Sequence, residues 1–179
     1  MSLTLISTTD ITSGTSNKVT IDNVFSADYK VYCIQFHNTN AGTQRENNSM
    51  DFRLVDSTGT EIAANYDARH YMFRGYTNTP FTLGGNNRDE FALIYHDTAA
   101  NDGLGNGTIW LFDPFGSNYT YQNFQESGSM AYPSTTKIGV HIRGGAVHKS
   151  NTSCTGISFT NRDNYSITNL SCNIYGLEQ

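Results

Sequence analysis

The chain has few charged residues, three prolines, three cysteines and no long hydrophobic run. Of its 179 residues only 15% are Asp, Glu, Lys or Arg, well below the roughly 25% usual in soluble domains. A coiled coil or helix bundle needs abundant Ala, Glu, Lys, Leu and Arg, so this composition excludes both. Asn, Thr, Ser and Gly take their place, and 11 Tyr and 10 Phe argue against a disordered chain. We therefore expect an all-β protein with a neutral, hydrogen-bonding surface.

Positive charge is also scarce. Lys and Arg number 11 against 16 Asp and Glu, for a net charge of -5, and no basic run occurs. Binding to nucleic acid or to an anionic membrane relies on clustered Lys and Arg, so both partners are disfavoured. The short apolar run at residues 3–6 lacks a positively charged flank, and no apolar run could span a bilayer. The sequence therefore predicts no signal peptide, no transmembrane segment and folding in a cytoplasm.

Cysteine and histidine form no recognisable redox or metal motif. Cys33, Cys154 and Cys172 lack CxxC spacing, so we expect buried free thiols, with a Cys154–Cys172 disulfide as the alternative. The loop at 97–106 has oxygen ligands that suit calcium but fails the EF-hand spacing, and turn-forming Asn and Asp explain it more simply. The histidines are not paired at metal-binding spacing and are expected at the surface or at interfaces: His37, His70, His96, His141 and His148.

Enzyme motifs are missing as well. The chain has no GxSxG, HExxH or P-loop motif, and the glycines at 103–107 lack a following helix and lysine, so they are predicted as loop backbone. A pair of carboxylates could hydrolyse glycosides, but nothing indicates that two of them face each other, and we expect a solvated surface. The candidates are Asp51, Asp89, Glu90 and Glu126. We predict a protein that is not an enzyme and that uses no cofactor or metal.

Apolar residues recur with a period of two rather than 3.6, which is typical of β-strands. The spacing predicts a single-domain antiparallel β-sandwich over residues 1–179, jelly-roll-like, although an immunoglobulin-like strand order stays open. Residues 63–68 also fit a helical turn. About ten strands are expected, at 18–22, 29–36, 51–55, 60–62, 69–76, 90–95, 108–112, 119–124, 137–143, 156–160 and 171–177.

Turn and loop residues separate these strands. Asp56 and Ser57 can satisfy backbone donors and Gly59 can take a positive φ, so residues 56–59 predict a tight hairpin turn. The polar stretches at 37–49 and 97–107 are predicted to be long exposed loops.

Tyrosine is in surplus for a domain of this size, so several are expected at the surface. Tyr together with Asn suits sugar binding by stacking and hydrogen bonds. It suits protein interfaces equally, because Tyr is enriched and charge is depleted there, and we favour this interpretation. The candidate interface or glycan-contact residues are Tyr66, Tyr71, Tyr76, Tyr95, Tyr119, Tyr121 and Tyr132.

Several segments together resemble a family of small β-rich virion structural proteins of marine tailed bacteriophages, of the cyanophage and pelagiphage type. The similar segments are 3–9, 21–32, 52–62, 155–159 and 174–177. They are strands and turns without a functional motif, and residues 63–106 are not diagnostic. The resemblance implies a virion structural protein and carries over no catalytic residue.

Composition and resemblance together predict a non-enzymatic structural protein of a phage virion, assembled in the host bacterial cytoplasm. A capsid decoration or cement role on the head surface is favoured, and a tail or fibre component comes next. We expect contacts with copies of itself, for example in trimers, and with virion proteins such as the major capsid protein. The alternative is a carbohydrate-binding module that recognises glycans of the host surface.

Overall fold

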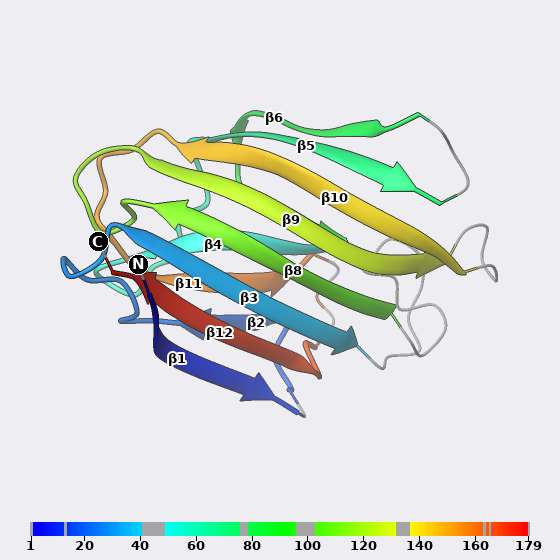
Figure 1. Cartoon of the computed structure of the whole chain (residues 1–179), viewed down its shortest axis with the longest axis horizontal. Coiled ribbons are helices and arrows are strands. Elements are labelled where there is room, and N and C mark those ends of the chain that lie inside the picture. The colour runs from blue at the N-terminus through cyan, green and yellow to red at the C-terminus, as the bar shows by residue number, and fades with distance from the viewer. Residues whose placement is uncertain are drawn as a thin grey trace.

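The computed structural model describes residues 2–12, 14–40, 49–75, 79–95, 103–131, 137–162, 164 and 166–178 (Figure 1). These residues include no helix with the length and apolarity that a membrane crossing requires. The strands are β1 (Leu3–Ile11), β2 (Lys18–Ile21), β3 (Val31–Asn40), β4 (Ser49–Asp56), β5 (Tyr66–Arg74), β6 (Phe81–Arg88), β7 (Ala92–Tyr95), β8 (Gly103–Phe112), β9 (Thr120–Ala131), β10 (Lys137–His148), β11 (Cys154–Asn161) and β12 (Leu170–Leu177).

These strands form two antiparallel sheets, with β2, β11 and β4 lying behind β12, β3 and β8 (Figure 1). The larger sheet has the order β1-β12-β3-β8-β9-β10-β5-β6, and the smaller has β2-β11-β4-β7. Four antiparallel pairs enclose one another in sequence order: β1 with β12, β2 with β11, β3 with β8 and β4 with β7. Together they form a nested ribbon of paired strands that is divided between the two sheets. This double-sheet order is a jelly roll, and β9, β10, β5 and β6 widen one of its sheets. The predicted all-β, jelly-roll-like sandwich is confirmed.

The core lies between the two sheets and is built by period-two alternation. Along β3, Tyr32, Ile34 and Phe36 are buried toward the smaller sheet, while Gln35 is exposed on the opposite side. Phe159 of β11 meets Phe36 with ring centroids 6.0 Å apart and Phe52 of β4 at 5.6 Å. One hydrophobic cluster therefore joins both sheets.

The hairpin turn predicted at residues 56–59 is confirmed. Gly59 has a φ of 78° and its N–H donates to the Asp56 carbonyl at 3.0 Å. The Asp56 carboxylate accepts from the backbone N–H groups of Thr58 and Thr60. The chain then returns along β4, where the N–H of Ile62 donates to the Leu54 carbonyl at 2.9 Å.

The loop predicted at 97–107 is wrong in its second half, because β8 already begins at Gly103. Gly107 is a strand glycine rather than a turn glycine. A Cβ there would come within 2.5 Å of the Phe36 ring, so the missing side chain makes room for that ring. The first half of this predicted loop, 97–102, lies outside the described residues. In the other predicted loop, 37–49, residues 41–48 lie outside the described residues, and its two ends belong to β3 and β4 instead.

Two strands were not expected, and two local predictions are wrong. No strand forms at 60–62, where Glu61 makes only an isolated bridge with Val55. β1 and β6 are both sheet edges, where the alternation of burial is weak. The helical turn considered for 63–68 does not form, because β5 starts at Tyr66. The Tyr66 hydroxyl donates to the Ile62 carbonyl at 3.0 Å and accepts from the Leu54 N–H at 3.1 Å, which ties this end of β5 to the smaller sheet.

Candidate functional site

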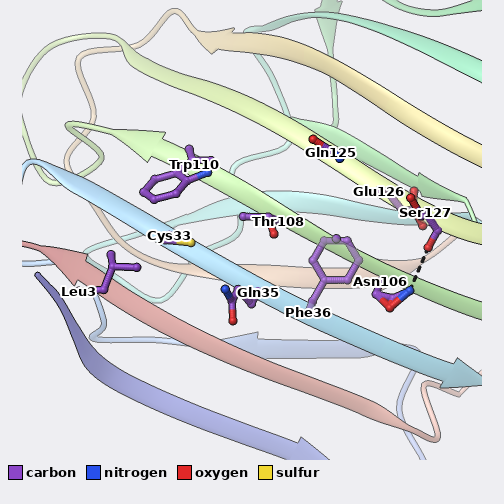
Figure 2. A pocket seen from close by; sticks show the side chains of 11 residues that line it. Leu3, Cys33, Gln35, Phe36, Asn106, Thr108, Trp110, Gln125, Glu126 and Ser127 are labelled. Carbon is purple, nitrogen blue, oxygen red and sulfur yellow. Dashed lines mark hydrogen bonds between the residues drawn. The ribbon is translucent and has the colours of Figure 1, made fainter.

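The larger sheet turns one face to the core and the other, the outer face, away from the smaller sheet. A groove of about 670 Å³ crosses this outer face over β3, β8 and β9 (Figure 2). Trp110 and Cys33 lie at one end, next to Leu3 of β1, whereas Asn106 and Ser127 lie at the other. The remaining lining residues are Gln35, Phe36, Gly107, Thr108, Gln125 and Glu126.

Strand register places the polar side chains of the groove in rows. Thr108 lies directly opposite Gln35 on β3 and Gln125 on β9, so the three stand side by side across the sheet. Asn106 lies opposite Ser127 in the next such row. Phe36 and Glu126 alternate with these residues and are buried, so they form the floor.

Internal hydrogen bonds hold one end of the groove in place. The Asn106 Nδ2 donates to the Ser127 carbonyl at 3.2 Å, and the Ser127 hydroxyl lies 3.1 Å from His141 Nδ1. Within the described part of the chain, by contrast, the side chains of Gln35, Thr108 and Gln125 have no hydrogen-bond partner. Their amide and hydroxyl groups are therefore available to a ligand.

A second, smaller groove of about 440 Å³ lies on the same outer face over β9, β10, β5 and β6. Tyr121 and Val147 border it at one side, and Arg69 and Asn86 at the other. Arg69 donates to the Asn86 side chain at 3.3 Å and to the Ala68 carbonyl, so its guanidinium is partly engaged.

One end of the outer face is apolar. Cross-strand pairs run from Val31 on β3 to Phe112 on β8, Tyr121 on β9 and Val147 on β10, and Leu3 pairs with Leu177 at the β1–β12 side. The exposed fraction is 44% for Leu3, 40% for Phe112 and 55% for Tyr121. We call this row the apolar band: Leu3, Val31, Phe112, Tyr121, Val147 and Leu177.

The seven tyrosines predicted as contact residues do not share one place. Tyr71, Tyr119 and Tyr121 are indeed exposed, at 49%, 45% and 55%. Tyr66 is fully buried, and its ring stacks on Phe91 at 5.0 Å, so its prediction as a surface contact is wrong. Tyr95 belongs to β7. The other two predictions, for Tyr76 and Tyr132, lie outside the described residues.

The sequence suggested that the candidate carboxylates form a solvated surface. This is wrong for three of them, because Asp51, Glu90 and Glu126 are all at most 2% exposed. Arg162 bridges Asp51, Glu90 and the exposed Asp89, which places three of the four candidates in one cluster. Glu126 is part of the groove floor instead. The cluster ties the end of β11 to β4 and to the link between β6 and β7.

Ion pairs extend this cluster over the outer surface of the smaller sheet. Arg53 contacts Asp51 at 2.7 Å and Glu61 at 3.3 Å, and Lys18 contacts Glu61 at 3.1 Å. Burial raises the pKa of Glu61, but hydrogen bonds from Ser158, Lys18 and Thr160 outweigh it, so its pKa lies below the ordinary value. Each carboxylate thus has a cationic partner, which is typical of a structural network.

Burial also corrects the expectation for two histidines. His70 and His148 are at most 1% exposed, and burial lowers the pKa of both, to about 4 for His70. His37 is exposed, and His96 lies outside the described residues. The three cysteines are buried and free, as predicted. Over the described ranges, no group of three or more His, Cys, Asp or Glu side chains is placed to hold a metal ion.

No protein-family model matches the chain, and no curated protein matches it. Two solved structures are similar in outline. One is the carbohydrate recognition domain of Emp47p, with 10% identity and a TM-score of 0.31, over 93% of this chain and 82% of that chain. Another is the CBM2 module of the evolved Dit of Lactobacillus casei BL23 phage J-1, with 10% identity and a TM-score of 0.26, over 90% and 70%. At these TM-scores the likeness carries no functional argument.

Among the groove residues, only Glu126 was a candidate site residue from the sequence, whereas Cys33 was expected as a buried thiol and Gly107 as loop backbone. Trp110 stands in a continuously apolar segment, 108–112, which reads as a strand buried on both faces. The usable signal is the neighbouring strand, where Gln35 and His37 alternate with Ile34 and Phe36. That alternation indicates a sheet with one polar, solvent-facing side.

Proposed function

We propose that the chain is a non-enzymatic structural protein of a phage virion. A position on the capsid surface is the favoured role, and a tail or fibre component is the second choice. The observation that supports this role best is the apolar band, which offers an uncharged surface for contacts between subunits. The resemblance of segments such as 21–32 and 52–62 to virion proteins points the same way.

The band suits contacts with copies of the same chain. Each copy carries a net charge of -5, so a contact between copies is least opposed where no like charges are brought close together. All six residues of the band are uncharged, and the neighbouring Lys30 and Asp113 neutralise each other in an ion pair of 2.9 Å. Exposed apolar patches with aromatic residues and little charge are typical of interfaces.

Self-association gives the first test. Light scattering of the purified chain at micromolar concentration is expected to report a mass of at least twice the 19.8 kDa of the monomer. Phe112→Glu and Tyr121→Glu place charge in the band and are expected to return the protein to the monomer mass. Tyr71→Glu is the matched control, because Tyr71 is similarly exposed on the same face but lies outside the band.

The position in the virion gives the second test. Quantitative mass spectrometry of purified particles is expected to find the chain in on the order of tens to hundreds of copies, since decoration and cement proteins follow the symmetry of the shell. Absence from the particle would contradict the proposed function. A monomer both alone and with the capsid protein would contradict the role of the band.

A further inference from the structure

The groove across β3, β8 and β9 is lined by neutral groups that both donate and accept hydrogen bonds. Gln35, Gln125 and Asn106 each carry a carboxamide with an acceptor oxygen and a donor NH₂, and Thr108 and Ser127 carry hydroxyls. Sugar hydroxyls have the same double character. A ligand with many hydroxyls can therefore satisfy Gln35, Thr108 and Gln125, whose side chains have no partner in the described chain.

The lack of exposed charge in the groove argues against ionic ligands. The side chains that rise from its polar rows, at positions 35, 106, 108, 125 and 127, are all uncharged. An anion would need Lys or Arg, and a cation would need exposed carboxylates. The one acidic lining residue, Glu126, is only 1% exposed. The groove therefore fits a polar ligand without net charge.

Trp110 supplies an aromatic surface at one end of the same groove. It lies opposite Cys33 on β3 and Asn123 on β9, and it is half-buried, so one part of the indole faces outward (Figure 2). The C–H groups on the face of a sugar ring are apolar and weakly positive, and they are attracted to the negative face of an indole. From Trp110 to Asn106 along β8 the strand spans roughly 13 Å, which gives room for more than one sugar ring.

We propose that this groove binds a short stretch of an uncharged polysaccharide, which lies along β8 with one sugar on Trp110 and its hydroxyls bonded to Gln35, Thr108 and Gln125. The volume of about 670 Å³ lies within the range of small-ligand sites, roughly 300–1,000 Å³. The groove is bordered by the apolar band but uses other side chains, apart from Leu3 at the shared margin. A subunit can therefore hold a neighbour and a glycan at once, and this binding goes beyond a structural role.

Binding is tested on the full-length protein with an array of neutral and acidic oligosaccharides. Retention is expected on neutral chains and not on uronic-acid or sialic-acid chains. The chain contains one tryptophan, so titration with the retained neutral oligosaccharide is expected to change the fluorescence of Trp110 directly, in step with the heat measured by calorimetry.

Variants separate the groove from the rest of the surface. Gln35→Ala and Gln125→Ala are each expected to weaken binding about fivefold, the equivalent of one net hydrogen bond, and Trp110→Ala by at least about tenfold. Trp110→Phe keeps an aromatic ring, so it serves where Trp110→Ala fails to fold, and it is expected to retain part of the affinity. The control Asn151→Ala removes an exposed amide outside the groove and is expected to change nothing.

Three outcomes would overturn the inference: no retention of any glycan by the folded protein, retention of acidic chains alone, or affinities that Gln35→Ala and Gln125→Ala leave unchanged. None of these bears on self-association, which Phe112→Glu tests. If Phe112→Glu abolished glycan binding and Gln125→Ala left it unchanged, the glycan would contact the apolar band, and its assignment to the groove would be overturned.

Discussion

Two buried titratable side chains act on stability in opposite directions. Burial, followed by a hydrogen bond with Asp89, raises the pKa of Glu90 from 4.5 to about 7. Burial lowers the pKa of His70 from 6.5 to about 4. The Glu90 contribution to the free energy of unfolding is therefore complete below about pH 4.5 and is lost as the pH rises toward 7. The His70 contribution is complete above pH 6.5 and is lost as the pH falls toward 4.

Single substitutions should uncover each effect. Between pH 4.5 and 6.5, the free energy of unfolding of Glu90→Gln minus that of the parent is expected to rise with pH. The same difference for His70→Gln is expected to fall with pH. Each difference has an upper bound on the order of 3 kcal/mol, from shifts of about two and a half pKa units. Urea unfolding at several pH values measures both. Variants whose stability changes with pH in parallel with the parent would contradict this account.

At the scale of elements, β6, a strand that the sequence did not predict, depends on one glycine. Gly84 has a φ of 102°, and a Cβ on it would lie 2.2 Å from the Ala68 carbonyl oxygen of the neighbouring β5. Gly84→Ala is therefore expected to cost about 2 kcal/mol or more, which lowers the melting temperature by roughly 4–8 °C in a chain of this size.

Gly139 in β10 is the matched control. No atom lies within 4 Å of a Cβ built there, and its φ is not in the left-handed region. Gly139→Ala is expected to leave the melting temperature unchanged or to raise it slightly, because alanine has less conformational freedom to lose. Equal losses in both variants, measured by thermal unfolding, would show that the Ala68 contact is not the cause.

Glycine-rich segments are where the prediction of strands from the sequence fails. Where apolar residues alternate, as in 137–143 or 171–177, the pattern identifies strands, because one face of each is buried. Gly103–Gly107 and Gly84–Gly85 carry the composition of turns, yet they pair within sheets through contacts with β3 and β5 that only the tertiary structure creates. The groove depends on the same long-range register, so its rows could not be read from one strand at a time.

At the scale of the whole molecule, the largest network of charged side chains lies around the smaller sheet. Four basic and four acidic side chains neutralise one another around the outer surface of the smaller sheet: Lys18, Arg53, Arg88 and Arg162 with Asp51, Glu61, Asp89 and Glu90. The groove and the apolar band lie on the opposite outer surface, over the larger sheet. The shortage of charge in the composition therefore leaves an uncharged region on this face, made of the groove and the apolar band, whereas the second groove beside it carries Asp67 and Arg69.

The nested ribbon makes the most distant parts of the chain neighbours. β1 pairs with β12, and the Thr8 hydroxyl bonds Asn173 across 165 positions. The two ends also meet, since the N–H of Glu178 donates to the Ser2 carbonyl at 3.0 Å. Closing so long a loop costs conformational entropy before any contact compensates for it, and proteins dominated by such pairings fold slowly.

A circular permutant should relieve this cost. A short Gly/Ser linker would join Glu178 to Ser2, and the chain would open between Ser150 and Asn151, in the exposed connection from β10 to β11. The loop closed by β1 and β12 then shrinks by three to four doublings, worth about 2 kcal/mol. Refolding in stopped-flow experiments is expected to be at least about tenfold faster than in the parent. Refolding at the parental rate would show that the β1–β12 ladder closes only after the rate-limiting step.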